Sequence, residues 1–164
     1  VVELIPPDAK RWQPLVLAVD GPRTNVAALV QANRRRAIFI PDLCASGEIG
    51  GTRHHYVSPR DDEETAKMLY LMGESLVGRR AGELIALGKD AKRRFGKNPT
   101  VVTTGALAVP AAHAVAAEPG LFTDSDFIEP PASWSQTVRA GECSDYASSV
   151  NGALLKYDWT ELVE

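Results

Sequence analysis

The residues that come closest to a catalytic arrangement lie in one stretch, residues 100–119, which reads TVVTTGALAVPAAHAVAAEP. The pattern predicts a buried strand, a turn of small residues and a helix. A sharp strand-to-helix turn can lift a nucleophilic serine above the end of a sheet, in the pattern G-x-S-x-G. That spacing places Leu107 at the nucleophile position, between Gly105 and Val109. Because leucine has no group that a base can activate, we expect no Ser-His-acid reaction to start here.

Three side chains in loops that follow predicted strands are alternative nucleophiles: Cys44, Ser46 and Ser135. Cys44 is the strongest of them, since a thiolate forms more readily than an alkoxide. His54 and His55 lie in the same loop and are candidate bases. The competing interpretation is that Cys44 is an inert cysteine at a strand end and that both serines are ordinary loop residues.

The same histidines, His54 and His55, could instead bind a metal ion together with Asp42. Adjacent histidines point in different directions, and the loop has neither H-x-H nor H-x-x-x-H spacing. We therefore predict no metal site. We also predict no cofactor, because the loop DGPRTN after the first strand lacks the G-x-G-x-x-G pattern of dinucleotide-binding proteins, and the chain has no G-x-x-x-x-G-K-[ST] motif.

Three further ring side chains have both a functional and a structural interpretation. His113 lies in the predicted helix after the turn, among alanines, and we expect it to pack against the sheet. Trp134 and Trp159 follow the last predicted strand and could stack on a sugar ring. Packing of these two side chains within the protein is the favoured interpretation.

Composition favours one soluble globular domain over residues 1–164, because 45% of the residues are hydrophobic and 24% are charged. The net charge of -3 supplies no basic surface for nucleic acid. No apolar run reaches the ~20 residues that span a bilayer, so we expect no membrane insertion. Cys44 and Cys143 form no C-x-x-C pair and are expected to be free thiols. The chain begins without methionine or a signal peptide, and we expect it to be a fragment of a longer protein.

Strand patterns alternate with helix patterns, which predicts an α/β fold with a mostly parallel sheet flanked by helices. The predicted strands cover residues 14–19, 37–41, 100–104 and 126–130. The predicted helices cover residues 26–36, 63–95 with a break near Gly73, and 110–119, and a short helix is expected near the end of a loop-like tail. Ligands of such sheets bind beyond the carboxyl ends of the strands. We expect the edge of the last strand to be covered by the tail, by a second copy or by missing chain.

Six short motifs occur in a fixed order along most of the chain. They are DG after the first strand, DLCASGE after the second, LVGRRAGEL in the following helix, TGALAVPAAHA at the turn, SW after the last strand and GALLKYDWTEL near the end. In this order the chain resembles the α/β-hydrolase superfamily, and within it the acetyl xylan esterase and dienelactone-hydrolase-like branch.

The resemblance implies a partial hydrolase fold with three Rossmann-like layers. It implies an oxyanion hole formed by the N–H of Ala108 and an N–H near Gly21, although Pro22 next to it has none. With Leu107 at the nucleophile position, the expected function is a non-catalytic domain of an acetyl xylan esterase-type protein, with a carbohydrate or an acyl ester as ligand. The alternative is an active carboxylic-ester hydrolase that uses Cys44 or Ser46. The sequence leaves the compartment open, and a secreted or periplasmic parent protein is one option.

Overall fold

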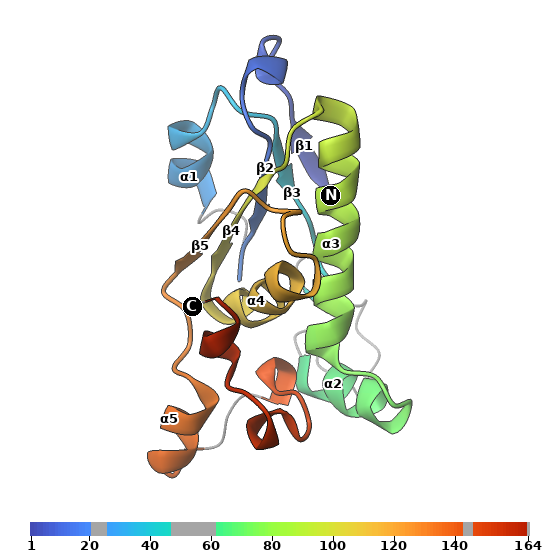
Figure 1. Ribbon diagram of the computed structural model, residues 1–164, viewed down its shortest axis with the longest axis vertical. Helices are drawn as coiled ribbons and strands as arrows, with labels where there is room; N and C mark the ends of the chain where they lie inside the picture. The colour runs from blue at the N-terminus through green and yellow to red at the C-terminus, as the bar shows by residue number, and fades with distance from the viewer. Residues whose placement is uncertain (21–25, 47–61, 143–145, 164) are drawn as a thin grey trace, which may run out of the picture.

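The computed structural model describes residues 1–20, 26–46, 62–142 and 146–163 (Figure 1). These residues contain five strands: β1 (Val2–Leu4), β2 (Leu15–Ala18), β3 (Ile38–Ile40), β4 (Thr100–Thr104) and β5 (Asp124–Ile128). Five α-helices accompany them in the described part of the chain: α1 (Ala27–Ala32), α2 (Asp62–Leu71), α3 (Leu76–Phe95), α4 (Ala108–Ala117) and α5 (Trp134–Arg139). The predicted α/β class is confirmed.

The strands form one mostly parallel sheet in the order β1-β3-β2-β4-β5. β2 pairs in parallel with β3 and with β4, and β4 pairs in parallel with β5. The central strand β2 is buried along its whole length, which explains its continuous apolar sequence. Of these five strands, β1 alone is antiparallel, and it pairs with β3 at one edge of the sheet.

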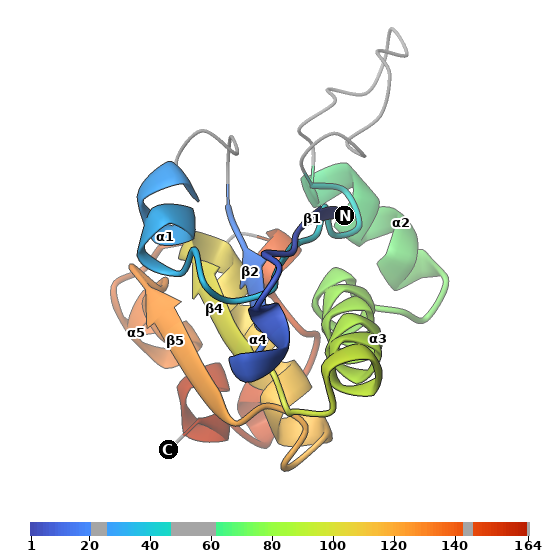
Figure 2. The same ribbon diagram turned by 90° about the horizontal axis from the view of Figure 1, so that it is seen from above.

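Helices cover both faces of the sheet, so the fold has three layers (Figure 2). On one face α3 and α4 pack on Val16, Ala18 and Val101, and these side chains form the largest core cluster together with Leu84. On the other face α1 covers Leu15 and the other residues of β2 and β3 that point the opposite way. This alternation along β2 follows from the two-residue period of a strand.

The long helical segment is divided, as the sequence predicts. α2 ends at Leu71, Gly73 takes a left-handed φ of 78°, and the side chain of Ser75 then accepts a hydrogen bond from the N–H of Gly78 at the start of α3. At the other end of α3, Gly96 has a φ of 68° and closes the helix. Local capping signals therefore set both ends of α3.

Three predictions about the elements need correction. β1 was not expected, because its three residues are all exposed and show no buried pattern. The last strand begins two residues before the predicted range, since Asp124 and Ser125 pair with the start of β4 even though they are polar. α5 lies in the stretch expected to be loop-like.

Both edges of the sheet lack a further strand among the described residues, because β1 and β5 each pair with one neighbour. The sequence analysis expects this edge to be covered by the tail, by a second copy or by missing chain; among the described residues, no strand of the tail pairs with β5. Asp124 and Asp126 are exposed on β5. Charged side chains on an edge strand discourage pairing with another chain, so they protect this edge.

Candidate functional site

The carboxyl ends of β2 and β4 meet at a sharp bend between β4 and α4. Gly105 begins this bend with a φ of 56°, and a short 3₁₀ turn, Gly105–Leu107, leads directly into α4. Asp20, which follows β2, reaches across from the neighbouring strand. Its main-chain N–H donates to Thr104 Oγ1 at 2.9 Å, and its Oδ2 accepts from the N–H of Ala106 at 3.1 Å. The apex of the bend is therefore closed by a carboxylate.

Gly105 fits this bend because it has no side chain. A Cβ atom placed there would lie 2.7 Å from Asp20 Oδ2, which is closer than nonbonded atoms approach. Its φ also lies in the left-handed region, which residues with a Cβ rarely adopt. The strained residue at a sharp strand-to-helix turn is where a hydrolase carries its nucleophile. In this bend the residue with a positive φ is Gly105, two residues before Leu107.

Leu107 does not project above the sheet, so this sequence-based prediction is wrong. Its side chain is only 3% exposed and packs in the core cluster with Val16, Ala18 and Leu43. The proposed oxyanion donor Ala108 is also fully buried, and its N–H donates to carbonyl groups of the preceding 3₁₀ turn. Because that N–H is engaged within the helix start, it is not directed at a ligand.

Cys44 and Ser46 lie in the loop after β3, and α3 holds this loop in place. The side chain of Glu83 accepts from the N–H of Cys44 at 2.8 Å, and Arg80 Nε donates to the carbonyl oxygen of Cys44 at 2.9 Å. Arg80 is 3% exposed and forms an ion pair with Asp62 at 2.8 Å. Two residues of the motif LVGRRAGEL therefore fix the backbone at Cys44, within the motif DLCASGE.

The chemistry of these two candidates is unfavourable for attack. Burial raises the pKa of the Cys44 thiol, and the nearby carboxylate of Glu83 raises it further. A thiol is a much weaker nucleophile than a thiolate. The hydroxyl of Ser46 donates to the carbonyl oxygen of Leu43 at 2.8 Å, in a local turn. The surroundings of Cys44 and Ser46 therefore activate neither side chain for nucleophilic attack.

Ser135 lies at the start of α5. Ser135 and the residues next to it surround the carboxylate of Asp158. The carboxylate of Asp158 accepts from the N–H of Trp134 at 3.0 Å and from the N–H of Ser135 at 2.8 Å. Burial raises the pKa of Asp158, but hydrogen bonds from Ser135, Trp134 and Ser133 outweigh it and hold the pKa below its usual value. Ser135 therefore helps to bind a structural carboxylate, which joins α5 to the tail.

His113 packs beside this junction in an aromatic cluster with Trp134 and Tyr157. Its Nδ1 is 2.8 Å from the carbonyl oxygen of Val109, and its Nε2 is 2.9 Å from the hydroxyl of Tyr157. The carbonyl can only accept, so Nδ1 carries the proton and Nε2 accepts from the tyrosine. Burial lowers the pKa of His113. These contacts place His113 in a structural role.

The two candidate sugar-stacking residues, Trp134 and Trp159, are 6% and 3% exposed and belong to one core cluster. The favoured interpretation of these side chains as packing residues is confirmed. Trp134 Nε1 donates to the carbonyl oxygen of Ser148 at 3.0 Å, and Trp159 Nε1 donates to that of Ala132 at 3.3 Å.

Four of the sequence candidates, Gly21, His54, His55 and Cys143, lie outside the described residues. Asp42 is half-buried directly after β3. Within the ranges that the structure covers, no three His, Cys, Asp or Glu side chains converge in a way that could hold a metal ion.

Comparison with protein-family models, with curated proteins and with solved structures gives no significant match for this chain. None of the helices in the described ranges combines the length and the hydropathy needed to traverse a bilayer.

Sequence reasoning missed the residues that organise this end of the sheet. Arg80 and Glu83 lie three positions apart, which puts both on one side of a helix, but charged residues at that spacing are usually solvated. α5 had a usable signal, since Ser133 and Gln136 form a capping box of the type S-x-x-Q. The approach of Asp20 to Gly105 had no local signal.

Proposed function

We propose that this chain is a non-catalytic α/β-hydrolase-like domain of an acetyl xylan esterase-type protein. The observation that carries the proposal is the bend after β4, where Gly105 has no side chain and the carboxylate of Asp20 accepts the N–H of Ala106. An ester hydrolase needs a nucleophile at this bend and free N–H donors for a developing oxyanion. A carboxylate in the same place repels an oxyanion.

The relationship to the esterase branch rests on the ordered motifs and on the α/β architecture. Two of these motifs are in contact, because Arg80 and Glu83 in LVGRRAGEL bind the backbone of Cys44 in DLCASGE. The strand-to-helix bend carries a third motif. These contacts support the view that the motifs form one structural unit rather than a chance series of short matches.

Hydrolysis of p-nitrophenyl acetate tests the absence of catalysis. We expect p-nitrophenol to be released no faster in the presence of the purified chain than in the presence of N-acetylhistidine that supplies the same concentration of imidazole groups. The rival function is an active ester hydrolase with Cys44, Ser46 or Ser135 as nucleophile. Saturable turnover that one of the variants Cys44→Ala, Ser46→Ala or Ser135→Ala abolishes would overturn the proposal. Ser125→Ala, on β5, is the matched control.

A further inference from the structure

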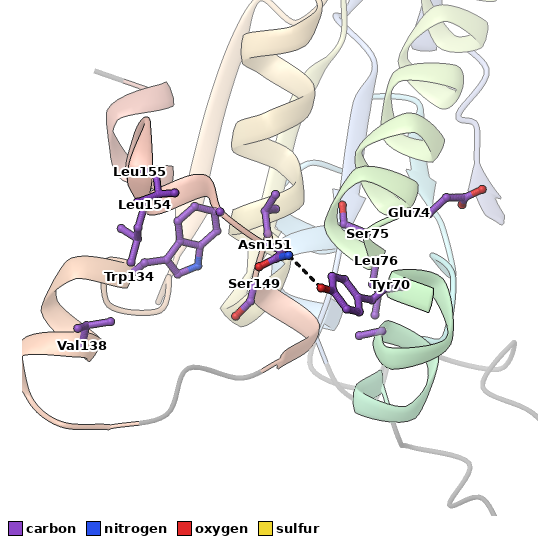
Figure 3. A pocket seen from close by; sticks show the side chains of 13 residues that line it. Tyr70, Glu74, Ser75, Leu76, Trp134, Val138, Ser149, Asn151, Leu154 and Leu155 are labelled. Atoms are coloured by element: carbon purple, nitrogen blue, oxygen red, sulfur yellow. Dashed lines mark hydrogen bonds between the residues drawn. The ribbon is translucent and has the colours of Figure 1, made fainter. Parts of the chain in front are cut away.

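A pocket of about 330 Å³ lies beyond the carboxyl ends of the strands, away from the bend after β4 (Figure 3). Three segments that are distant in sequence form it: the junction of α2 and α3, the helix α5, and the tail at residues 149–155. Its volume falls in the range of about 300 to 1,000 Å³ that is usual for small-molecule sites.

Apolar side chains form most of the wall. They are contributed by all three segments: Ala66, Leu76, Trp134, Val138, Val150, Leu154 and Leu155. Figure 3 shows the ring of Trp134 on one side of the pocket and the ring of Tyr70 on the other. Since the N–H of Trp134 is bound to Ser148, the indole offers a ligand only its apolar ring.

Five of the described lining side chains are polar, and all of them except Glu74 are neutral: Tyr70, Glu74, Ser75, Ser149 and Asn151. The hydroxyl of Tyr70 accepts from Asn151 Nδ2 at 3.2 Å, so it keeps its own hydrogen for donation to a ligand. Among the described lining residues the single charged side chain is Glu74, and Figure 3 shows its carboxylate turned away from Trp134. The lining residues that the structure describes supply no positive charge for an anionic ligand.

From this lining we infer that the pocket binds a small neutral molecule with an aromatic or short aliphatic body and one hydrogen-bonding group. The body lies between Trp134 and Leu154, and the polar group meets the hydroxyl of Tyr70. A sugar is a poorer fit, because its many hydroxyls require more polar partners than this wall supplies. A carboxylate is disfavoured because it would lose its hydration without gaining a cationic partner.

This inference does not depend on the proposed function. The pocket shares no residue with the bend after β4, so an active esterase and an inert domain could both contain it. Its test measures binding and not hydrolysis, and the two proposals therefore fail separately.

Benzyl alcohol, benzoate and methyl β-xyloside are suitable probes for titration of the ¹⁵N-labelled chain by NMR. We expect benzyl alcohol to shift the indole N–H of Trp134 and the amides of Asn151 and Gly152 saturably. The dissociation constant should be millimolar, because so small a molecule gains little binding free energy. Benzoate has the same ring with a carboxylate and should bind at least tenfold more weakly. The xyloside should give no saturable shift at Trp134.

Two surface variants separate this pocket from general apolar binding. Leu154→Glu places a charge on the pocket wall and should weaken benzyl alcohol binding at least tenfold. Leu71→Glu makes the same change at a residue that is 78% exposed and does not line the pocket, so its binding should match the wild type. Tyr70→Phe removes the hydroxyl and should weaken binding about threefold. Thermal unfolding of each variant checks that the fold is kept.

Several outcomes would overturn the inference. These are absence of a saturable shift with benzyl alcohol, equal binding by wild type and Leu154→Glu, equal binding of benzoate, or saturable xyloside binding at Trp134. Sedimentation that shows a dimer abolished by Leu154→Glu would assign the surface to a second copy of the chain instead.

Discussion

The bend after β4 and the start of α5 use the same contact in two different ways. At each place a carboxylate accepts a hydrogen bond from main-chain N–H groups at a helix start. Asp20 is exposed and accepts the N–H of Ala106. Asp158 is 7% exposed and accepts the N–H groups of Trp134 and Ser135.

The difference shows what burial does to a carboxylate. Asp158 is shielded from water, so its hydrogen bonds cannot be replaced and α5 depends on them. Water can replace the partner of Asp20, and the main effect of this side chain is to occupy the space in front of Gly105. The carboxylate of Asp158 holds the tail to the domain, and that of Asp20 closes the space in front of Gly105 at the apex of the bend.

Leu107→Ser should have the largest effect on stability, because it changes a buried side chain at the bend after β4. The change removes a buried side chain from the core and buries a hydroxyl, so we expect a loss of about 4 kcal/mol in the free energy of unfolding. Urea denaturation measures this loss. The variant should also remain inactive toward p-nitrophenyl acetate. A neutral effect on stability would show that residue 107 is not in the core.

Asp158→Ala should be next, because it removes the buried acceptor of the N–H groups of Trp134 and Ser135 and of the hydroxyls of Ser133 and Ser135. We expect a loss of about 3 kcal/mol, together with a change in the fluorescence of Trp134. Asp124→Ala, an exposed aspartate on β5, is the control and should cost less than about 0.5 kcal/mol. Equal effects of the two changes would contradict the structural role given to Asp158.

Gly105→Ser sharpens the comparison at the bend. A residue with a Cβ must adopt a left-handed φ and must also displace the carboxylate of Asp20, so we expect a cost of about 2 kcal/mol. Asp20→Ala alone should cost about 1 kcal/mol, as for the loss of an exposed capping group. In the double variant that combines Asp20→Ala with Gly105→Ser, the loss of stability caused by Gly105→Ser should be smaller, since the clash with the carboxylate of Asp20 is removed. Additive effects would mean that the two residues are not in contact.

The smallest expected effect is on the pH dependence of stability, and it arises from the side of the molecule near α5. Burial lowers the pKa of His113 below its ordinary value of 6.5. The unfolded chain therefore binds a proton as the pH falls through 6.5, while the folded protein does not, and stability declines in this window until the lower folded pKa is passed. His113→Gln should remove this decline, as measured by urea unfolding between pH 8 and pH 5. A decline that persists unchanged in the variant would assign it to another group.

The sequence located the central strands and the helices between them for a clear physical reason, although α1 ends at Ala32, four residues before the predicted end. β2 and β3 are buried on both faces and are apolar throughout, whereas β4, TVVTT, is also buried and is identified by its β-branched residues. β1 and β5 lie at the edges, where exposed and polar residues are tolerated, and the same criterion missed the first and misplaced the start of the second. For the candidate site, the sequence predicted only the location, at the carboxyl ends of the strands.

What the sequence determined by itself was the α/β class, the division of the long helical segment at Gly73, and the small residues at the bend after β4, because each depends on residues close together in the chain. Tertiary structure decided the rest. Asp20 and Ala106 are 86 positions apart, and parallel pairing of β2 with β4 brings them into contact. Only that pairing decides that Leu107 turns into the core and that Gly105, closed in by a carboxylate, is the residue at the apex.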